Sequence, residues 1–347
     1  MKISIGTNIK EGPWGGGNLF ALNLIGYLKR NGHRVINHLL DDDIDLILIT
    51  EPRRTSESSA FTHLDVIDYL KYINKNALVV HRINECDERK NTNYVNKYLI
   101  EANKAADQTI YVSTWLMNLY LDQGINDKNN KVILAGADKQ IFNNRDFTPW
   151  DKKGKLKIVT HHWGANWNKG FEIYSQIDNM LESDLWKEKI EFTYIGNLPR
   201  KFTFKNAKCV QPLSGIELAK EIKKNNLYIT GSLNEPSGNH HIEGAQCGLP
   251  LLYIDSGGMS EYCKDYGIAF EKNNLETKIN EMIINYDKYV DRLKSYKFDA
   301  ELMCSEFESL FVKMHNNKNY YLENRFVDMK KNILQEKFFN IKRSMKK

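Results

Sequence analysis

Residues 231–261 read GSLNEPSGNHHIEGAQCGLPLLYIDSGGMSE, and the order of features in this segment decides the fold. Glu235 and Glu243 are separated by seven residues. Between them, residues 236–238 are the turn formers Pro, Ser and Gly, with an N-cap among them. We therefore expect Glu235 in a loop and Glu243 one to two turns into the helix that follows. Both carboxylates would then face one cleft.

The segment continues with a helix end, a strand and a second loop. Gly248 is a natural helix stop, and Leu249–Ile254 has the apolar character of a short buried strand. The loop Asp255–Gly258 then opens another helix. A strand, a glycine loop and a helix in this order expose backbone N–H groups that suit a phosphate.

Several of these features together resemble one known family. The resemblance is carried by the Glu235 to Glu243 spacing, by the step Gly248-Leu249-Pro250, and by the glycine pair that precedes Glu261. They are similar to the donor-binding motif of retaining glycosyltransferases of family 4, the glycosyl transferases group 1. The resemblance implies an α/β protein with the GT-B fold, in which two doubly wound Rossmann-like parallel-sheet domains face each other across a cleft. It also implies a nucleotide-sugar substrate.

The resemblance assigns roles to residues of this segment. Glu243 would accept hydrogen bonds from two ribose hydroxyls, a geometry that suits a carboxylate. Glu235 would bind sugar hydroxyls near the reacting carbon, and we assign it to catalysis. We assign Asn239, Gly257 and Gly258 to donor binding.

Two domains are also expected on physical grounds. The chain has 347 residues, which is long for one core and suits two domains of roughly 150 residues each. Strands alternate with helices in both halves, which favours parallel sheets. We expect an N-terminal acceptor-side Rossmann-like domain over 1–148 and a C-terminal nucleotide-sugar-binding domain over 149–315. A helical basic tail over 316–347 could pack back on the N-terminal domain.

A glycine-rich loop lies between a predicted strand, Lys2–Thr7, and a predicted helix, Leu19–Leu28. Its spacing is not Gly-x-Gly-x-x-Gly, and no Lys-Ser or Lys-Thr follows it. A tight turn alone would account for the glycines. The resemblance implies instead that Gly15, Gly16 and Gly17 reach across the cleft to the donor phosphates.

His81 follows the predicted strand Ala77–Val80, and open α/β sheets bind ligands at the carboxyl ends of their strands. A lone histidine is more often structural. In the family, however, a histidine just after this strand approaches the donor sugar, so the resemblance places His81 in the catalytic group. The family commonly has Asp at the next position, where this chain has Arg82.

The second half opens with a predicted strand, Leu156–Thr160, which is followed by Lys169 and Gly170. These two residues match the family's Lys-Gly, whose lysine neutralises the donor diphosphate, and we assign Lys169 to catalysis. Most members carry an arginine about five residues before this lysine, and this chain has none between Leu156 and Lys169. Either another basic group substitutes for the arginine or the loop is built differently.

We expect no metal, and no cofactor besides the nucleotide-sugar co-substrate. Asp41–Asp45 contains Asp-x-Asp, but the apolar run Leu46–Ile49 follows the acidic residues, as in a solvated turn before a strand. His161 and His162 lack a third ligand at a suitable spacing. The five cysteines are scattered, with no paired spacing for a metal or redox site.

The net charge of +5 is concentrated at the end of the chain. Residues 329–347 carry seven Lys or Arg and one Glu, a net +6, which leaves −1 for the rest. We expect no nucleic-acid binding, because such proteins spread basic residues over a body surface. Apolar residues at helical spacing in this tail predict peripheral contact with an anionic membrane, and a solvated terminal helix is the alternative. Without a span-length apolar run or a signal peptide, we expect a cytoplasmic protein, on the inner face of the membrane if the tail binds it.

The sequence therefore predicts a metal-independent retaining glycosyltransferase that moves a sugar from a nucleotide-sugar donor to a carbohydrate, lipid-linked or other hydroxyl acceptor. Two alternatives stay open: a non-hydrolysing sugar-nucleotide epimerase of the same fold, and an inactive protein that binds nucleotide or carbohydrate. A two-carboxylate hydrolase would need Glu235 and Glu243 on opposite sides of a sugar, which neighbours on one loop-helix unit cannot easily supply.

Overall fold

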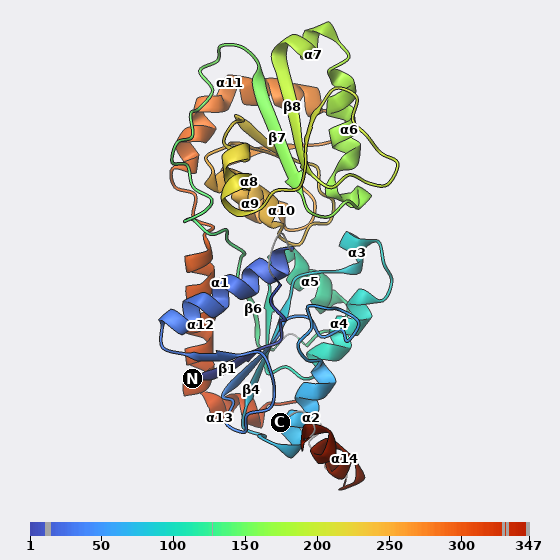
Figure 1. Cartoon of the computed structure of the whole chain (residues 1–347), viewed down its shortest axis with the longest axis vertical. Helices are drawn as coiled ribbons and strands as arrows, with labels where there is room; N and C mark the ends of the chain where they lie inside the picture. Colours follow the sequence, from blue (N-terminus) through green and yellow to red (C-terminus); the bar gives the residue numbers. More distant parts are fainter. Residues whose placement is uncertain (11–14, 127, 328–329, 331–332, 345–347) are drawn as a thin grey trace.

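The computed structural model describes residues 1–10, 15–126, 128–327, 330 and 333–344, which form two α/β domains, one above the other in Figure 1. Each domain has a six-stranded sheet in which all neighbouring strands are parallel. Helices cover both faces of each sheet, as parallel sheets require. The predicted pair of doubly wound domains is confirmed.

The first sheet has the strand order β2-β1-β3-β4-β5-β6. Its strands are β1 (Lys2–Ile5), β2 (Arg34–Ile36), β3 (Leu46–Ile49), β4 (Leu78–Ile83), β5 (Gln108–Tyr111) and β6 (Asn130–Val132). The helices between them are α1 (Gly16–Arg30), α2 (His63–Tyr72), α3 (Asp87–Lys90), α4 (Val95–Asn103) and α5 (Thr114–Asp122). Phe20, Leu24 and Leu28 are buried at four-residue intervals along α1, so one stripe of this helix packs on the sheet.

The second sheet has the order β12-β11-β10-β7-β8-β9. Its strands are β7 (Leu156–His162), β8 (Ile190–Gly196), β9 (Lys208–Val210), β10 (Leu227–Thr230), β11 (Leu251–Ile254) and β12 (Gly267–Phe270). Its helices are η1 (Trp167–Lys169), α6 (Phe171–Met180), α7 (Asp184–Lys189), α8 (Gly215–Ile222), α9 (Asn239–Gln246), α10 (Met259–Cys263) and α11 (Leu275–Leu293). From β7 the chain adds β8 and β9 on one side and then β10, β11 and β12 on the other, so the strand order reverses between β7 and β10. Open α/β sheets bind ligands at such a point, outside the carboxyl ends of the strands.

The chain returns to the first domain after α11. Helices α12 (Ala300–Asn316) and α13 (Lys318–Glu323) follow, and α12 runs beside α1 in Figure 1. Its buried side chains join the core under β1 and α1; they are Met303, Cys304, Phe307, Leu310, Phe311 and Met314. The predicted second domain, 149–315, included this helix, but its apolar stripe belongs to the core of the first domain.

The two segments that join the domains lie side by side. The N–H of Ala137 donates to the carbonyl of Phe298 at 3.3 Å, and the N–H of Ala300 donates to the carbonyl of Ala137 at 2.9 Å. A Cβ atom on Gly136 would lie 2.1 Å from the carbonyl oxygen of Asp299. Only glycine allows this close approach of the two backbones.

Helix α10 of the second domain contacts α5 of the first. The Glu261 carboxylate accepts hydrogen bonds from the N–H groups of Thr114, at 2.9 Å, and Trp115, at 3.1 Å, in the first turn of α5. A carboxylate at a helix N-terminus accepts from N–H groups that have no partner within the helix, and it is attracted by the positive end of the helix dipole. The Tyr262 hydroxyl donates to the carbonyl of Val112. The carboxyl ends of the two sheets are therefore in contact.

A buried ion pair fastens the segment after α13 to the first domain. Arg325 donates to both carboxylate oxygens of Asp107, at 2.8 and 2.7 Å, and also to the carbonyls of Lys75 and Ala77. The side chains of Arg325 and Asp107 are 5% and 0% exposed. This guanidinium is a structural contact, with four hydrogen bonds to the first domain.

The last helix, α14 (Ile333–Ser344), rests on the first domain near α2 (Figure 1). Arg343 pairs with Asp42, while Leu334 and Ile341 are exposed. The rest of the predicted membrane-binding tail, at 329, 331–332 and 345–347, lies outside the described residues. No helix in the described part of the chain combines the length and the apolar character that crossing a membrane needs.

Candidate functional site

The candidate site lies where the loops that leave β7 and β10 meet α3 of the first domain (Figure 1). Glu235 sits in the loop after β10, Lys169 at the end of η1 after β7, and Arg89 in α3. Strands β7 and β10 are neighbours at the point where the strand order of the second sheet reverses. The loops that leave them therefore bring Lys169 and Glu235 together.

Glu235 accepts two charge-assisted hydrogen bonds at one oxygen. Its Oε2 lies 2.9 Å from Nε of Arg89 and 3.1 Å from Nζ of Lys169. Burial raises the pKa of the Glu235 carboxyl, but the charges of Lys169 and Arg89 outweigh burial and bring this pKa to about 2. Burial lowers the pKa of Lys169, and the facing Glu235 carboxylate opposes that effect. The site is therefore an ionised carboxylate held between two cations.

Arg89 is the site residue that sequence reasoning missed. The chain has no arginine between Leu156 and Lys169, and the structure brings the second cation from the other domain. Two asparagines of the second domain hold the backbone of α3: Asn168 donates to the carbonyl of Arg89 at 3.4 Å, and Asn234 donates to the carbonyl of Glu88 at 3.2 Å. The sequence signal that could have identified Arg89 is its place just after β4, because open α/β sheets bind ligands beyond the carboxyl ends of their strands.

Contacts within the first domain fix the position of α3. The Asp87 carboxylate accepts hydrogen bonds from the three consecutive N–H groups of residues 94–96, at 2.9 to 3.1 Å. Glu85, just before α3, pairs with both Arg53 and Lys90. Arg89 is thus presented on a short, well-braced turn.

Lys169 is placed by a turn that requires glycine. Gly170 follows it with φ of +101°, in the left-handed region. A Cβ atom on Gly170 would lie 2.6 Å from the carbonyl carbon of Gly231, so the loops after β7 and β10 touch at this point. The N–H of Leu233 also donates to the carbonyl of Asn168, at 2.9 Å. The predicted Lys-Gly step therefore serves to bring Lys169 to Glu235.

Glu243 lies in the second turn of α9, as predicted, and its partner is a histidine. Nε2 of His161 is 2.7 Å from Oε2 of Glu243, and Nδ1 of the same ring is 3.0 Å from the Tyr228 hydroxyl. A carboxylate only accepts, so His161 donates to Glu243 from Nε2. All three side chains belong to the second domain and are buried.

Three further histidines fill the space between β7 and α9. His162 lies 2.7 Å from the Tyr174 hydroxyl, and His240 lies 2.8 Å from the Thr230 hydroxyl. Neither nitrogen of His241 has a hydrogen-bond partner in the described structure, and its side chain is fully buried. Burial lowers the pKa of His162 and His240 well below the usual range and that of His241 to about 3. These rings are neutral packing groups at working pH.

The glycines assigned to the donor lie in two different settings. A Cβ atom on Gly16 would lie 3.3 Å from the side chain of Asn239, so the start of α1 meets the start of α9 across the domains. At Gly15 and Gly17 a Cβ atom would meet nothing within 4 Å. Residues 12–14 of the predicted loop lie outside the described residues.

Gly257 and Gly258 pack against protein backbone. A Cβ atom on Gly257, which has φ of +75°, would lie 2.4 Å from the carbonyl oxygen of Glu235. A Cβ atom on Gly258 would lie 2.5 Å from Pro236 and from Ser113 of the first domain. Their small size lets the loop after β11 support the backbone of Glu235, and their assignment to donor binding stays a prediction.

The structure does not bring His81 to this site. The strand was predicted to end at Val80, but β4 continues to Ile83. Alternation along the strand therefore turns His81 toward α4, where its Nδ1 lies 2.9 Å from Oδ1 of Asn103 and its ring is 0% exposed. Burial lowers its pKa to about 4. His81 is a buried structural residue, and Arg82 takes the opposite face.

The residues weighed as metal ligands have other partners. Asp41 and Asp43 pair with Lys2, and Asp45 accepts from the backbone N–H of Lys2 at 2.7 Å, all at the amino ends of the strands. Within the described ranges, no group of three or more His, Cys, Asp or Glu residues is arranged to hold a metal ion.

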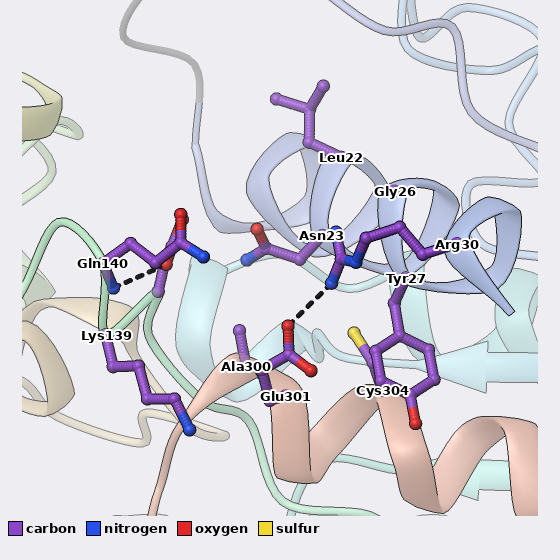
Figure 2. Close-up of a pocket in the computed structure, with 11 residues that line it drawn as sticks. Leu22, Asn23, Gly26, Tyr27, Arg30, Lys139, Gln140, Ala300, Glu301 and Cys304 are labelled. Atoms are coloured by element: carbon purple, nitrogen blue, oxygen red, sulfur yellow. Dashed lines mark hydrogen bonds and ion pairs between the residues drawn. The ribbon is translucent and has the colours of Figure 1, made fainter.

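A separate pocket of about 260 Å³ lies between α1, α12 and residues 138–140 (Figure 2). Arg30 and Glu301 form an ion pair of 2.6 Å within it. Its lining includes none of the predicted site residues. It is therefore a feature of the junction between the domains, distinct from the site around Glu235.

Two doubly wound parallel-sheet domains whose carboxyl edges face each other, with a final helix returning to the first domain, define the GT-B fold. The chain matches no known protein-family profile and no curated protein sequence. Solved structures of similar fold include a glycosyltransferase from Rickettsia africae, at 14% identity and TM-score 0.64, covering 91% of this chain and 99% of that one. HepE of Anabaena in complex with UDP-glucose matches at 14% identity and TM-score 0.65, covering 90% and 100%. An α-glucosyltransferase in complex with UDP matches at 13% identity and TM-score 0.57, covering 90% and 99%.

Proposed function

We propose that this chain is a metal-independent retaining glycosyltransferase that moves a sugar from a nucleotide-sugar donor to a carbohydrate, lipid-linked or other hydroxyl acceptor. One observation carries the proposal: Lys169 and Arg89, from different domains, converge on Glu235 at the reversal point of the second sheet. UDP is the first nucleotide to test, because HepE and the α-glucosyltransferase of similar fold were solved with UDP or UDP-glucose.

The cations would stabilise the leaving group. As the bond between the anomeric carbon and the phosphate oxygen breaks, negative charge builds up on the nucleoside diphosphate. Lys169 and Arg89 are preorganised cations in a largely buried site, where their effect on that charge is greater than in water. Arg89 would supply the positive charge that the loop before Lys169 lacks.

The two carboxylates would hold different parts of the donor. Glu243 would accept hydrogen bonds from the ribose hydroxyls and Glu235 from sugar hydroxyls near the reacting carbon. In the structure, Glu243 is hydrogen-bonded to His161, and Glu235 to Arg89 and Lys169. Donor binding would exchange some of these contacts for contacts to the ligand, with Asn239 at the start of α9 close to it.

The acceptor proton has a natural destination in a retaining reaction. The acceptor hydroxyl would form its bond to the anomeric carbon on the face that the phosphate leaves, and the departing phosphate oxygen would take the proton. No protein base is then required, in keeping with the other residues at this site being cations, a low-pKa carboxylate and neutral buried histidines. Retention is tested by the anomeric configuration of the product, and accumulation of an epimerised nucleotide sugar would indicate an epimerase.

A nucleotide screen tests the proposal. A ligand that binds only the native state stabilises it by RT ln(1 + [L]/Kd), about 2.7 kcal/mol at a hundredfold excess over Kd. UDP, GDP, ADP and CMP, followed by their sugars, should therefore include one series that raises the melting temperature of wild type and not of Lys169→Ala. If no nucleotide stabilises the protein, the proposed function is wrong. Sugar transfer that is lost in EDTA and restored by Mn²⁺ would contradict metal independence.

A further inference from the structure

Glu261, in the first turn of α10, connects this helix to α5 of the other domain. Both of its carboxylate oxygens accept from the first turn of α5: Oε2 from the N–H of Thr114 and Oε1 from the N–H of Trp115. Two charge-assisted hydrogen bonds to consecutive N–H groups fix the position and the direction of the helix that they cap. Glu261 therefore sets where α5 lies relative to the second domain.

The start of α10 is also attached to the backbone of Glu235. The N–H of Gly258 donates to the carbonyl of Glu235 at 2.8 Å, and Gly257 forms a parallel bridge with Glu235. These contacts lie within the second domain and leave the Glu235 carboxylate free for its two cations. A movement of α5 relative to α10 is therefore also a movement relative to Glu235.

Helix α5 in turn holds the segment that carries Arg89. The hydroxyl of Tyr120, a fully buried residue of α5, donates to the carbonyl of Glu85 at 2.9 Å, just before α3. Nearer the end of α5, the side-chain amide of Gln123 donates to the Glu88 carboxylate at 3.4 Å. The position of Arg89 therefore depends on the position of α5.

These contacts form a closed ring. It runs from the backbone of Glu235 through the start of α10 to Glu261, through α5 to α3, and returns to the Glu235 carboxylate at Arg89, 2.9 Å away. Under the proposed function, the donor diphosphate takes over part of the contact between Arg89 and Glu235. The position of α3 must then be held by contacts outside the site, and the Glu261 cap is such a contact.

We propose that Glu261 is a positioning residue, which acts through α5 and α3 to hold Arg89 at the leaving group. This inference rests on the proposed function and assigns a role in transfer to a side chain that does not itself touch the cations. The effect should appear in the rate of bond breaking more than in nucleotide affinity. The proposed ribose contact at Glu243 lies within the second domain and does not need α5.

A double-mutant cycle in the full chain tests whether Glu261 acts through Arg89. The proteins are wild type, Glu261→Ala, Arg89→Met and the double variant, with Glu217→Ala as the control. Glu217 also lies in the first turn of its own helix, α8, and pairs with Lys220 of that helix. The rate measured is the release of UDP from UDP-glucose with water as the acceptor, and UDP affinity is measured by calorimetry.

Glu261→Ala should lower the rate about tenfold in the wild-type background, the factor expected for one charged hydrogen bond, and less than twofold in the Arg89→Met background. UDP affinity should change less than threefold. Glu261→Gln keeps one accepting oxygen and should have an intermediate rate, whereas Glu217→Ala should stay within twofold of wild type. Equal losses in both backgrounds would overturn the inference, as would no loss, or a loss of UDP affinity as large as the loss of rate.

Hydrogen exchange of the ligand-free proteins gives a readout that needs no donor. In Glu261→Ala, amide exchange should rise at least threefold both in residues 114–117 and in residues 86–92, and Glu217→Ala should change neither segment. A rise confined to residues 114–117 would make Glu261 a helix cap only and overturn the inference. If wild type neither binds UDP nor releases it from UDP-glucose, the proposed function fails for this donor, and the exchange of residues 86–92 still decides whether Glu261 positions α3.

Discussion

Replacing Glu235 with glutamine tests the cation pair at the centre of the site. The change keeps the shape of the side chain and removes the negative charge that Lys169 and Arg89 share. Because the pKa of Glu235 is about 2, the wild-type carboxylate is charged at every pH above about 4. The variant therefore gains one unit of positive charge at the site over the whole working range.

Two effects of opposite sign are expected. A hydrogen bond to a charged group is worth about 1.5–3 kcal/mol, so a diphosphate that takes Lys169 or Arg89 must displace a contact of that size from Glu235. Since each 1.4 kcal/mol is tenfold in affinity, UDP should bind Glu235→Gln about tenfold to a hundredfold more tightly than it binds wild type. Turnover should fall by about the same factor, because the variant loses a charged contact to the reacting sugar.

Calorimetry with UDP and with the nucleotide sugar, together with the initial rate of donor consumption, measures both effects. Glu217→Gln is the matched control, because Glu217 is exposed on α8 and, within the described residues, its one ion pair is with the exposed Lys220. The nucleotide sugar should gain less affinity than UDP, since it alone loses the contact to sugar hydroxyls. If UDP affinity and turnover fall together, Glu235 binds the nucleotide instead of restraining the cations, and the reasoning is refuted.

Three further predictions concern the second carboxylate, the histidines and the tail. Glu243→Gln should weaken nucleotide and nucleotide-sugar binding together, about tenfold to a hundredfold by calorimetry, because the ribose contact precedes reaction; a loss in turnover alone would contradict this. His162, His240 and His241 have pKa values lowered by burial, so their contribution to stability is complete above about pH 6.5, the unfolded value, and is lost as the pH falls below it. Below pH 6 each of these three rings should cost about 1.4 kcal/mol of unfolding free energy per pH unit, so the slope measured by urea unfolding should be smaller by that amount in His241→Leu; an unchanged slope in that variant would count against the assignment. Deleting residues 329–347 should reduce co-sedimentation with anionic vesicles, since each basic residue near such a surface is worth about 1 kcal/mol, and equal sedimentation of both chains would remove the idea.

Short-range sequence signals located much of the site. The turn formers after Glu235 and the helix that contains Glu243 are confirmed, because caps and turns depend on residues a few positions apart. Lys169 and Gly170 were also placed correctly, at the end of a turn after β7. The alternation of strands with helices gave the two parallel sheets, because each sheet needs helices between its strands.

The features that sequence reasoning missed depend on tertiary contacts. Arg89 and Glu235 are 146 residues apart, and α3 is too short to show a hydrophobic period. The direction of His81 depended on where β4 ends, and element ends are set by packing as much as by local sequence. Three extra residues of strand, 81–83, turned His81 into the core and gave Arg82 the opposite face. The buried residues of α12 recur at helical spacing, but such a stripe does not say which of two sheets it covers.

The partners of the two carboxylates suggest how binding and chemistry are separated in space. Glu243 and its partners His161 and Tyr228 all belong to the second domain, so the proposed ribose contact needs that domain alone. Glu235 is different, because one of its cations, Arg89, comes from the first domain. Under the proposed function, a donor could dock on the second domain by its nucleoside, while full neutralisation of its diphosphate would require α3 to be in place. Activation of the leaving group would then depend on the domains being together, which limits loss of the sugar to water before the acceptor is enclosed.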